Sequence, residues 1–352
     1  MTHESLVITE RDTFALLEIV GRDELMRKVI ERLREGFIAV EHGSMEMSPP
    51  RSGFPKSFPV GGVIEWMPHR QPQLSTTIKT VSYSPANPKM YQAPTIAATI
   101  TRFDDITGRL MSVMDGALLT AVRTGAASAL ASEALALPTS SVIGMVGTGV
   151  QAVTQLHALS LVYEIKKVLA WDLDFEHLSS FKKRVAFLNL LIEDSSPDSI
   201  VAGSDIIVTA TSVDVGGGPV IEDTRAREHL HINAVGADLV GKIEIPKSML
   251  RRALVTTDSP AQALREGECQ QLSRAEIGPT LSQLCAEPES VRPFQSRLTV
   301  FDSTGIALED HLAMDVFLEL AVELDIGTYI AMGSKDSDYL DPYSEQVEER
   351  SV

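Results

Sequence analysis

The hydrophobic pattern of residues 140–160 changes within a few positions from the spacing of a strand to that of a helix. The apolar residues Val142, Ile143, Met145 and Val146 are typical of a buried strand. Glycines follow, and apolar positions then resume at intervals of three and four. The stretch therefore predicts a strand, a tight turn and a helix.

The second half of the chain repeats this alternation of buried strands and helical patterns. Further apolar runs that predict strands lie at 167–171, 204–212, 231–236, 253–257 and 298–302. Strands that alternate with helices form parallel sheets covered on both faces. We therefore expect an α/β fold with a Rossmann-type doubly wound sheet of about six strands.

The first half predicts a different arrangement. Short strands are expected at 6–8, 76–82, 95–102 and 110–114, with helices at 25–37 and 116–135. Residues 48–72 are rich in Pro and Gly, so we expect mostly irregular structure that could line a site, with one short strand-like piece at 63–67. These elements predict an α+β substrate and dimerisation domain of residues 1–131 and 309–352, beside a Rossmann domain of residues 132–308.

Composition narrows the class of protein. The chain has 352 residues, 44% of them hydrophobic, and 48 acidic against 31 basic side chains give a net charge of −17. This excess of acid argues against nucleic acid or an anionic membrane as partner. The two cysteines indicate neither a disulfide framework nor a metal site, and no metal is expected. The N-terminus lacks the pattern of a signal peptide, so the cytoplasm is the expected location.

The turn after the first Rossmann strand carries a dinucleotide fingerprint. Gly147, Gly149 and Ala152 form its G-x-G-x-x-A version, with the following helix pointing its N-terminus at a pyrophosphate. The next predicted strand ends in Asp172, near the spacing of about 20 residues at which an acid binds the ribose hydroxyls. An acid there repels a 2′-phosphate and favours NAD over NADP. The alternative is a Gly-rich turn that binds no cofactor.

Other polar residues follow the predicted strands. Ser212, Val213, Gly236 and Asp238 lie at strand ends, where open parallel sheets bind ligands. We expect the nicotinamide half of the cofactor there. Asp238 also precedes Lys242 by four residues, so a helix cap or an i,i+4 pair is an alternative role.

Charged residues occur in apolar surroundings in the first half. Lys79 shares a strand face with Thr77 and Val81, although a solvated or snorkelling lysine is an alternative. Arg123 lies among small residues of the 116–135 helix, either paired to a carboxylate of the protein or available to a ligand. Arg51 and Glu65 lie in the Pro-rich stretch, where an unpaired charge would be costly.

The segments LLTAVRTGAASALASEAL, GMVGTGVQAVTQLHALS, HINAVGADLVGK, MPHR and IKTVSYSPANP resemble the ornithine cyclodeaminase and mu-crystallin family. The resemblance covers roughly residues 10–345. Within the family, RDELMRKVIERL, GVIEWMPHR, REHLHINAVGADLVGK and REGECQQL are similar to the lysine cyclodeaminases that make L-pipecolate.

The resemblance implies roles for individual residues. The substrate-binding positions it implies are Arg51, Glu65, Lys79, Arg123 and Asp238, with Asp238, Glu65 and Lys79 in catalytic roles. The cofactor positions it implies are Thr95, Gly147, Thr148, Gly149, Val150, Gln151, Asp172, Ser212, Val213, Val235, Gly236, Lys242 and Ser303.

The resemblance also implies an activity. A lysine cyclodeaminase using NAD would oxidise L-lysine at Cα, let the side-chain amine close the ring with loss of ammonia, and reduce the cyclic imine to L-pipecolate. Asp238 would carry the proton transfers. The choice of lysine over ornithine rests on the likeness alone. Ornithine cyclodeamination, net dehydrogenation of an amino or imino acid, and non-catalytic ligand binding stay open, and the family likeness suggests a homodimer.

Overall fold

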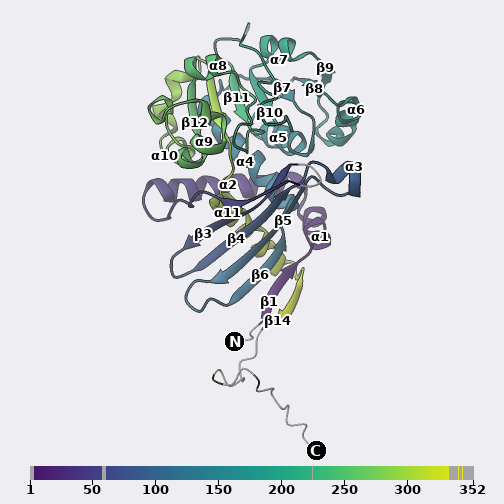
Figure 1. Cartoon of the computed structure of the whole chain (residues 1–352), viewed down its shortest axis with the longest axis vertical. Coiled ribbons are helices and arrows are strands. Elements are labelled where there is room, and N and C mark those ends of the chain that lie inside the picture. The colour runs from purple at the N-terminus through teal and green to yellow at the C-terminus, as the bar shows by residue number, and fades with distance from the viewer. Residues whose placement is uncertain (1–3, 58–60, 224, 333–339, 341–342, 344–352) are drawn as a thin grey trace, which may run out of the picture.

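The computed structural model describes residues 4–57, 61–223, 225–332, 340 and 343. Two seven-stranded sheets organise the chain, one mixed and one wholly parallel. In Figure 1 the parallel sheet and its helices form the upper part and the mixed sheet the lower part, with α2 (Arg22–Glu41) at the boundary. The expected α/β class with a Rossmann-type sheet is confirmed.

The mixed sheet is built mainly from neighbouring antiparallel strands. Its strands, in spatial order, are β14 (Thr328–Ala331), β1 (Glu4–Ile8), β6 (Leu110–Asp115), β5 (Ile96–Asp104), β4 (Ser75–Tyr83), β3 (Gly62–Gln71) and β2 (Ser52–Lys56). Only the pair of β1 and β6 is parallel within the described sheet. β14 lies antiparallel to β1, so residues 328–331 pair with residues 4–7 near the start of the described chain.

The parallel sheet has the strand order of a doubly wound fold. Its strands, in spatial order, are β12 (Leu254–Thr257), β13 (Thr299–Asp302), β11 (His231–Ala234), β10 (Ile206–Thr209), β7 (Val142–Val146), β8 (Lys167–Trp171) and β9 (Ile192–Asp194). The order reverses at β7, where β8 lies on one side and β10 on the other. Ligands bind at such a switch point, beyond the carboxyl ends of the strands.

Helices cover the sheets and join them. The α-helices besides α2 are α1 (Glu10–Val20), α3 (Asn87–Tyr91), α4 (Ala117–Leu135), α5 (Val150–Ser160), α6 (Phe175–Arg184), α7 (Pro197–Gly203), α8 (Lys247–Arg252), α9 (Pro260–Glu266), α10 (Leu281–Ala286) and α11 (Ala307–Glu323). Short 3-10 helices lie at 186–188, 268–271, 274–276, 288–290 and 292–294.

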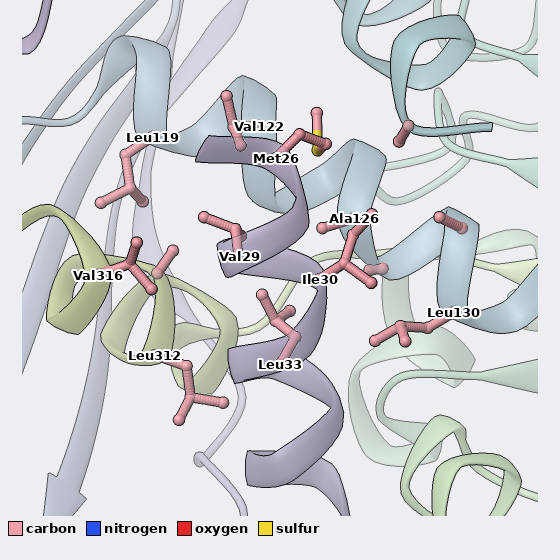
Figure 2. Packing of buried hydrophobic residues seen from close by; sticks show 14 of the residues in the cluster. Met26, Val29, Ile30, Leu33, Leu119, Val122, Ala126, Leu130, Leu312 and Val316 are labelled. Atoms are coloured by element: carbon pink, nitrogen blue, oxygen red, sulfur yellow. The ribbon is translucent and has the colours of Figure 1, made fainter. Parts of the chain in front are cut away.

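A hydrophobic core lies between the two sheets and is formed mainly by α2, α4 and α11. Figure 2 shows α2 packed between α4 and α11, with Val29 and Leu33 facing Leu312 and Val316. α4 and α11 also contact strands of the mixed sheet, and α4 contacts β11 and β13 of the parallel sheet. Charged residues on the inner face of α4 therefore lie close to both sheets, and those of α11 lie close to the mixed sheet and to α4.

Two expectations from the sequence were wrong in extent. Residues 48–72 contain β2 and β3, a hairpin, rather than mostly irregular chain. Pro55 is tolerated because β2 is an edge strand, and Pro68 lies past the end of β2, where β3 has no neighbour on that side within the described sheet. The parallel sheet has seven strands instead of about six, because the short strand β9 was not predicted from the hydrophobic pattern. The division at residues 131/132 and 308/309 stays a prediction.

Candidate active site

The fingerprint turn has the backbone that a dinucleotide requires. Gly147 directly follows β7 and has φ +91°, and a Cβ on it would lie 2.6 Å from the carbonyl oxygen of Ala210. Gly149 precedes α5, and a Cβ there would meet no described atom within 4 Å. Gly147 is therefore fixed by the protein's own packing, whereas Gly149 faces the open space that a pyrophosphate needs.

Asp172 lies at the end of β8, beside that turn. Its Oδ2 accepts hydrogen bonds from the backbone N–H and the hydroxyl of Thr148, at 2.6 and 2.9 Å. Arg184 of α6 donates to the carbonyl oxygens of Thr148 and Gly149, at 2.6 and 3.3 Å. The acid and the arginine hold the turn in place, and Val150 and Gln151 begin α5 directly after it.

The other predicted cofactor positions follow the neighbouring strands. Buried Glu244 accepts from the backbone N–H of Thr211 at 2.7 Å and from that of Gly236 at 2.8 Å, so it joins the ends of β10 and β11. Ser212, Val213 and Val235 lie next to these two bonds, and buried Ser303 follows β13. Thr95 lies just before β5 of the mixed sheet, next to Ile96, which pairs with Tyr83 of β4. Lys242 lies over the ring of this Tyr83, and the cofactor role of Thr95 stays a prediction.

Lys79 and Arg123 meet at a buried carboxylate. The Lys79 side chain is 1% exposed, on the inward face of β4, and its Nζ lies 2.7 and 2.8 Å from the two oxygens of Asp310. Arg123 of α4 donates from Nε to Asp310 Oδ1 at 3.0 Å and from Nη1 to Glu309 at 2.8 Å. The inward placement of Lys79 agrees with the strand alternation, and Arg123 is paired to carboxylates of the protein.

Arg51 joins the mixed sheet to the strand ends of the parallel sheet. Its Nε lies 2.8 Å from Glu266 and its Nη1 3.3 Å from Glu65 on the inward face of β3. Its Nη2 donates to the carbonyl oxygens of Thr304 and Gly305, directly after β13. Arg51 therefore links the predicted substrate residues to the edge where the predicted cofactor residues lie.

Burial and neighbouring charges set the protonation of these groups. Burial, with Arg123 close by, lowers the pKa of Lys79 to about 8 even though Asp310 opposes this shift. Burial raises the pKa of Glu309 to about 8 although Arg123 opposes it. Burial works against a charged Arg51, but Glu266, Glu65 and Asp238 raise its pKa. The site thus holds permanent arginine cations next to groups that titrate near neutral pH.

Asp238 lies in a turn after β11 and is half-buried. Its Oδ1 accepts from Lys242 Nζ at 3.0 Å, which is the i,i+4 pair considered from the sequence, although no helix forms there. Lys242 is buried, and its ammonium also faces the ring of Tyr83. A catalytic role for Asp238 stays a prediction that is compatible with this pair.

Sequence reasoning missed several residues of this region. The consecutive acids Glu309 and Asp310, which follow apolar Ala307 and Leu308 at the start of α11, were a usable signal, because buried acids need cationic partners. Glu266, Glu244 and Arg184 gave no comparable signal, because their partners lie far away in the sequence. Among the described residues, no group of His, Cys, Asp and Glu could hold a metal ion. No helix in the described part of the chain is long and apolar enough to cross a membrane.

Comparisons with known proteins extend this geometry. The model of the ornithine cyclodeaminase/mu-crystallin family matches residues 10–324. L-lysine cyclodeaminase of Streptomyces rapamycinicus is 46% identical over 341 residues, which are 97% of this chain and 99% of the relative. A lysine cyclodeaminase structure that describes recognition of L-lysine, L-ornithine and L-2,4-diamino butyric acid superposes with a TM-score of 0.96 at 55% identity, covering 97% of this chain and all of that one.

A more distant structure shows how far the fold extends. An archaeal alanine dehydrogenase dimer with bound NAD superposes with a TM-score of 0.84 at 28% identity, covering 94% of this chain and all of that one. The resemblance identified in the sequence is confirmed: the chain belongs to the ornithine cyclodeaminase/mu-crystallin family.

Proposed function

We propose that this chain is a lysine cyclodeaminase that converts L-lysine to L-pipecolate and ammonia with NAD as a catalytic cofactor. The observation that carries the proposal is the cluster of Arg51, Lys79 and Arg123, buried beside the strand ends of a dinucleotide-binding sheet. Three buried cations at such an edge suit the carboxylate of an amino acid. The identity to an L-lysine cyclodeaminase over nearly the whole chain supports the choice of substrate.

The fingerprint residues fit NAD. The open space at Gly149, the N-terminus of α5 and the carboxylate of Asp172 provide for a pyrophosphate and a ribose without a 2′-phosphate. When bound, NAD would supply hydride transfer, accepting a hydride from Cα and returning it to the same carbon after ring closure. Ser212, Val213, Val235, Gly236, Lys242 and Ser303 are the positions at which we propose the nicotinamide half is held.

The cations orient the amino acid. Arg123 and Lys79 would bind its carboxylate, which also makes Cα more electrophilic once nitrogen is double-bonded to it. Glu65 lies on the same inward face of the mixed sheet and would hold an ammonium group of the substrate. Holding both ends of L-lysine favours attack of its side-chain nitrogen on Cα over attack by water.

Asp238 would carry the protons. A protonated amine cannot act as a nucleophile, so a base must take a proton from each substrate ammonium, and departing ammonia must receive one. Asp238 is half-buried beside Lys242, on the turn that follows β11. We propose that it accepts and returns these protons, while the ammonium of Lys242 holds its carboxylate in place.

We also propose a homodimer formed through the outer face of the mixed sheet, and a cytoplasmic location serving pipecolate biosynthesis. Phe54, Ile64 and Trp66 are exposed on β2 and β3, on the side opposite buried Glu65 and Met67. Burying exposed apolar side chains of this kind against another surface is favourable. The same face of a second copy of the chain can provide that surface, as in a two-fold symmetric dimer. Trp66→Asp should therefore lower the mass measured by light scattering to that of a monomer, whereas an unchanged mass would contradict this interface.

The activity is tested with purified protein and a small amount of NAD⁺. L-Lysine and L-ornithine are incubated separately, and ammonia, pipecolate, proline and NADH are quantified. Equal amounts of ammonia and pipecolate from L-lysine, without accumulation of NADH, support the proposal. Accumulation of NADH in step with product would instead indicate a net dehydrogenase, and turnover of L-ornithine alone would indicate the shorter substrate.

A further inference from the structure

We propose that Asp310 is a positioning residue for the substrate carboxylate, because it ties Lys79 to Arg123 and keeps the lysine charged. Asp310 lies in the first turn of α11, is fully buried and contacts cations from two other elements. The inference rests on the proposed function, since it concerns how that amino acid is bound.

One carboxylate fixes both cations. Asp310 Oδ2 lies 2.7 Å from Lys79 Nζ, and Oδ1 lies 2.8 Å from the same nitrogen and 3.0 Å from Arg123 Nε. Lys79 comes from β4 and Arg123 from α4, so nothing in the local chain would otherwise hold the two side chains together. A carboxylate that accepts from both sets the distance between their remaining N–H groups.

The remaining donors explain why these two cations matter most. An arginine has five N–H groups. Within the described chain, Nη2 of Arg51 donates to two backbone carbonyl oxygens and Nη1 donates to Glu65. Its Nε makes no hydrogen bond with a described residue but lies 2.8 Å from the carboxylate of Glu266, so the donors of Arg51 already face oxygens of the protein. The contacts of Arg123 are made by Nε and Nη1 to Asp310 and Glu309, which leaves both N–H groups of Nη2. Arg123 and Lys79 are therefore the better partners for a substrate carboxylate.

The positive charges around Lys79 make the negative charge of Asp310 necessary to keep Lys79 protonated. Arg123 on α4 and Arg51 before β2 both lower the pKa of Lys79, in addition to burial, and Asp310 opposes them. The other charged or titratable groups in this network are Glu65 on β3, Glu309 on α11 and Asp258 after β12, the last acting on Arg123 and Glu309. Without the charge of Asp310, the pKa of Lys79 falls below about 8, and Lys79 loses its proton near neutral pH.

Glu309 provides the matched control. It neighbours Asp310 on the same turn, is equally buried and also bonds to Arg123. Its pKa is raised to about 8, so it is mainly protonated at neutral pH and contributes little charge there. Glu309→Gln therefore removes a similar group without removing the charge that acts on Lys79.

The test measures binding of L-lysine to protein saturated with NADH, in which the substrate cannot be oxidised. Isothermal titration calorimetry from about pH 4.5 to 9.5 compares the wild type with Asp310→Asn, Glu309→Gln and Lys79→Arg. Lys79→Arg keeps its charge at every pH, so its profile reports the titration of all other groups, including those of the ligand.

A step in affinity near pH 8 is expected in the wild type, because a protonated Lys79 is needed and its proton is lost as the pH rises. Asp310→Asn should move the part of this step that belongs to Lys79 down by about 1 to 3 pH units, and Glu309→Gln should keep its midpoint. Lys79→Arg should lack that part and show only the titration of Glu309 and of the ligand. A midpoint in Asp310→Asn that equals that of the wild type would overturn the positioning role of Asp310 but not the proposed function. Failure of the wild type to bind L-lysine would overturn the proposed function and the assignment together.

A second variant, which keeps the negative charge at position 310, allows the test to be made even when Asp310→Asn does not fold. If Asp310→Asn does not fold, Asp310→Glu is used, which retains the negative charge but displaces the carboxylate by one methylene. The assignment then predicts the wild-type midpoint with affinity at least 10-fold weaker, since the geometry of the two cations is disturbed. Wild-type affinity in Asp310→Glu would show that Asp310 does not position them.

Discussion

Substitution by alanine should have different effects at the two glycines of the fingerprint turn: at Gly147 it should lower stability, and at Gly149 it should lower the affinity for NAD⁺. Gly147→Ala places a Cβ 2.6 Å from the carbonyl oxygen and 2.8 Å from the carbonyl carbon of Ala210, at a residue with φ +91°. An L side chain with such a φ costs about 1–2 kcal/mol, and overpacking costs about 1–3 kcal/mol more. We therefore expect Gly147→Ala to lower the free energy of unfolding by about 2–5 kcal/mol.

Gly149→Ala is the matched control in the same turn. The residue has φ −71°, and its Cβ would meet no described atom within 4 Å, so stability should change by less than about 0.5 kcal/mol. The added methyl would instead occupy the space proposed for the pyrophosphate, and the affinity for NAD⁺ should fall at least about 10-fold, or ~1.4 kcal/mol.

Urea unfolding without cofactor and calorimetric titration with NAD⁺ separate the two effects. The expected result is a large loss of stability for Gly147→Ala, and a loss of affinity with normal stability for Gly149→Ala. Equal stability losses would refute the geometric argument. Wild-type NAD⁺ affinity in Gly149→Ala would refute the proposed place of the pyrophosphate.

Three further substitutions test separate parts of the account. Asp238→Asn should lower kcat by about 10²- to 10⁴-fold, because a general acid–base group is lost. It should also lower the thermal midpoint, because buried Lys242 loses its charged partner, so kcat is measured well below that midpoint. A kcat within threefold of wild type would remove Asp238 from the proton transfers. Asp172→Asn should raise the KM for NAD⁺ by about 10-fold and bring it closer to the KM for NADP⁺, because a ribose contact is lost and a 2′-phosphate is no longer repelled. If the ratio of the KM for NADP⁺ to the KM for NAD⁺ stayed as in the wild type, that result would count against the proposed ribose contact. Burial lowers the pKa of His231 to about 3, so the unfolded state binds one more proton than the native state as the pH falls below about 6.5, and stability is lost toward acid. His231→Gln should remove about 1.4 kcal/mol per pH unit of this dependence between pH 6 and 4, as measured by urea unfolding, and an unchanged slope would show that His231 is not the group responsible.

Local patterns predicted those parts of the fold that depend on neighbouring residues. The alternation around Lys79 predicted that its side chain shares a face of β4 with Thr77 and Val81, and the structure shows that Lys79 is buried on that face. The fingerprint spacing placed Gly147 and Gly149 between β7 and α5. The β2–β3 hairpin was missed because its prolines suggested irregular chain, and only the pairing shows that they lie where no backbone N–H is needed.

The partners of the buried charges could not be predicted in the same way. Lys79 and Asp310 lie 231 positions apart, and Arg51 meets the carbonyl oxygen of Gly305 across 254 positions. An isolated charge in an apolar stretch indicates that a partner exists, but burial energetics do not say which residue supplies it. The arrangement of α4, α11 and the two sheets makes that choice.

The fate of the two nitrogens of L-lysine tests the proposed cycle most directly. L-Lysine labelled with ¹⁵N at the α-amino group is incubated with the protein and catalytic NAD⁺, and ammonia and pipecolate are analysed by mass spectrometry. Ring closure at Cα predicts labelled ammonia and unlabelled pipecolate in equal amounts. Label retained in the ring, with unlabelled ammonia, would contradict oxidation at Cα and the site built around Lys79, Arg123 and Asp238.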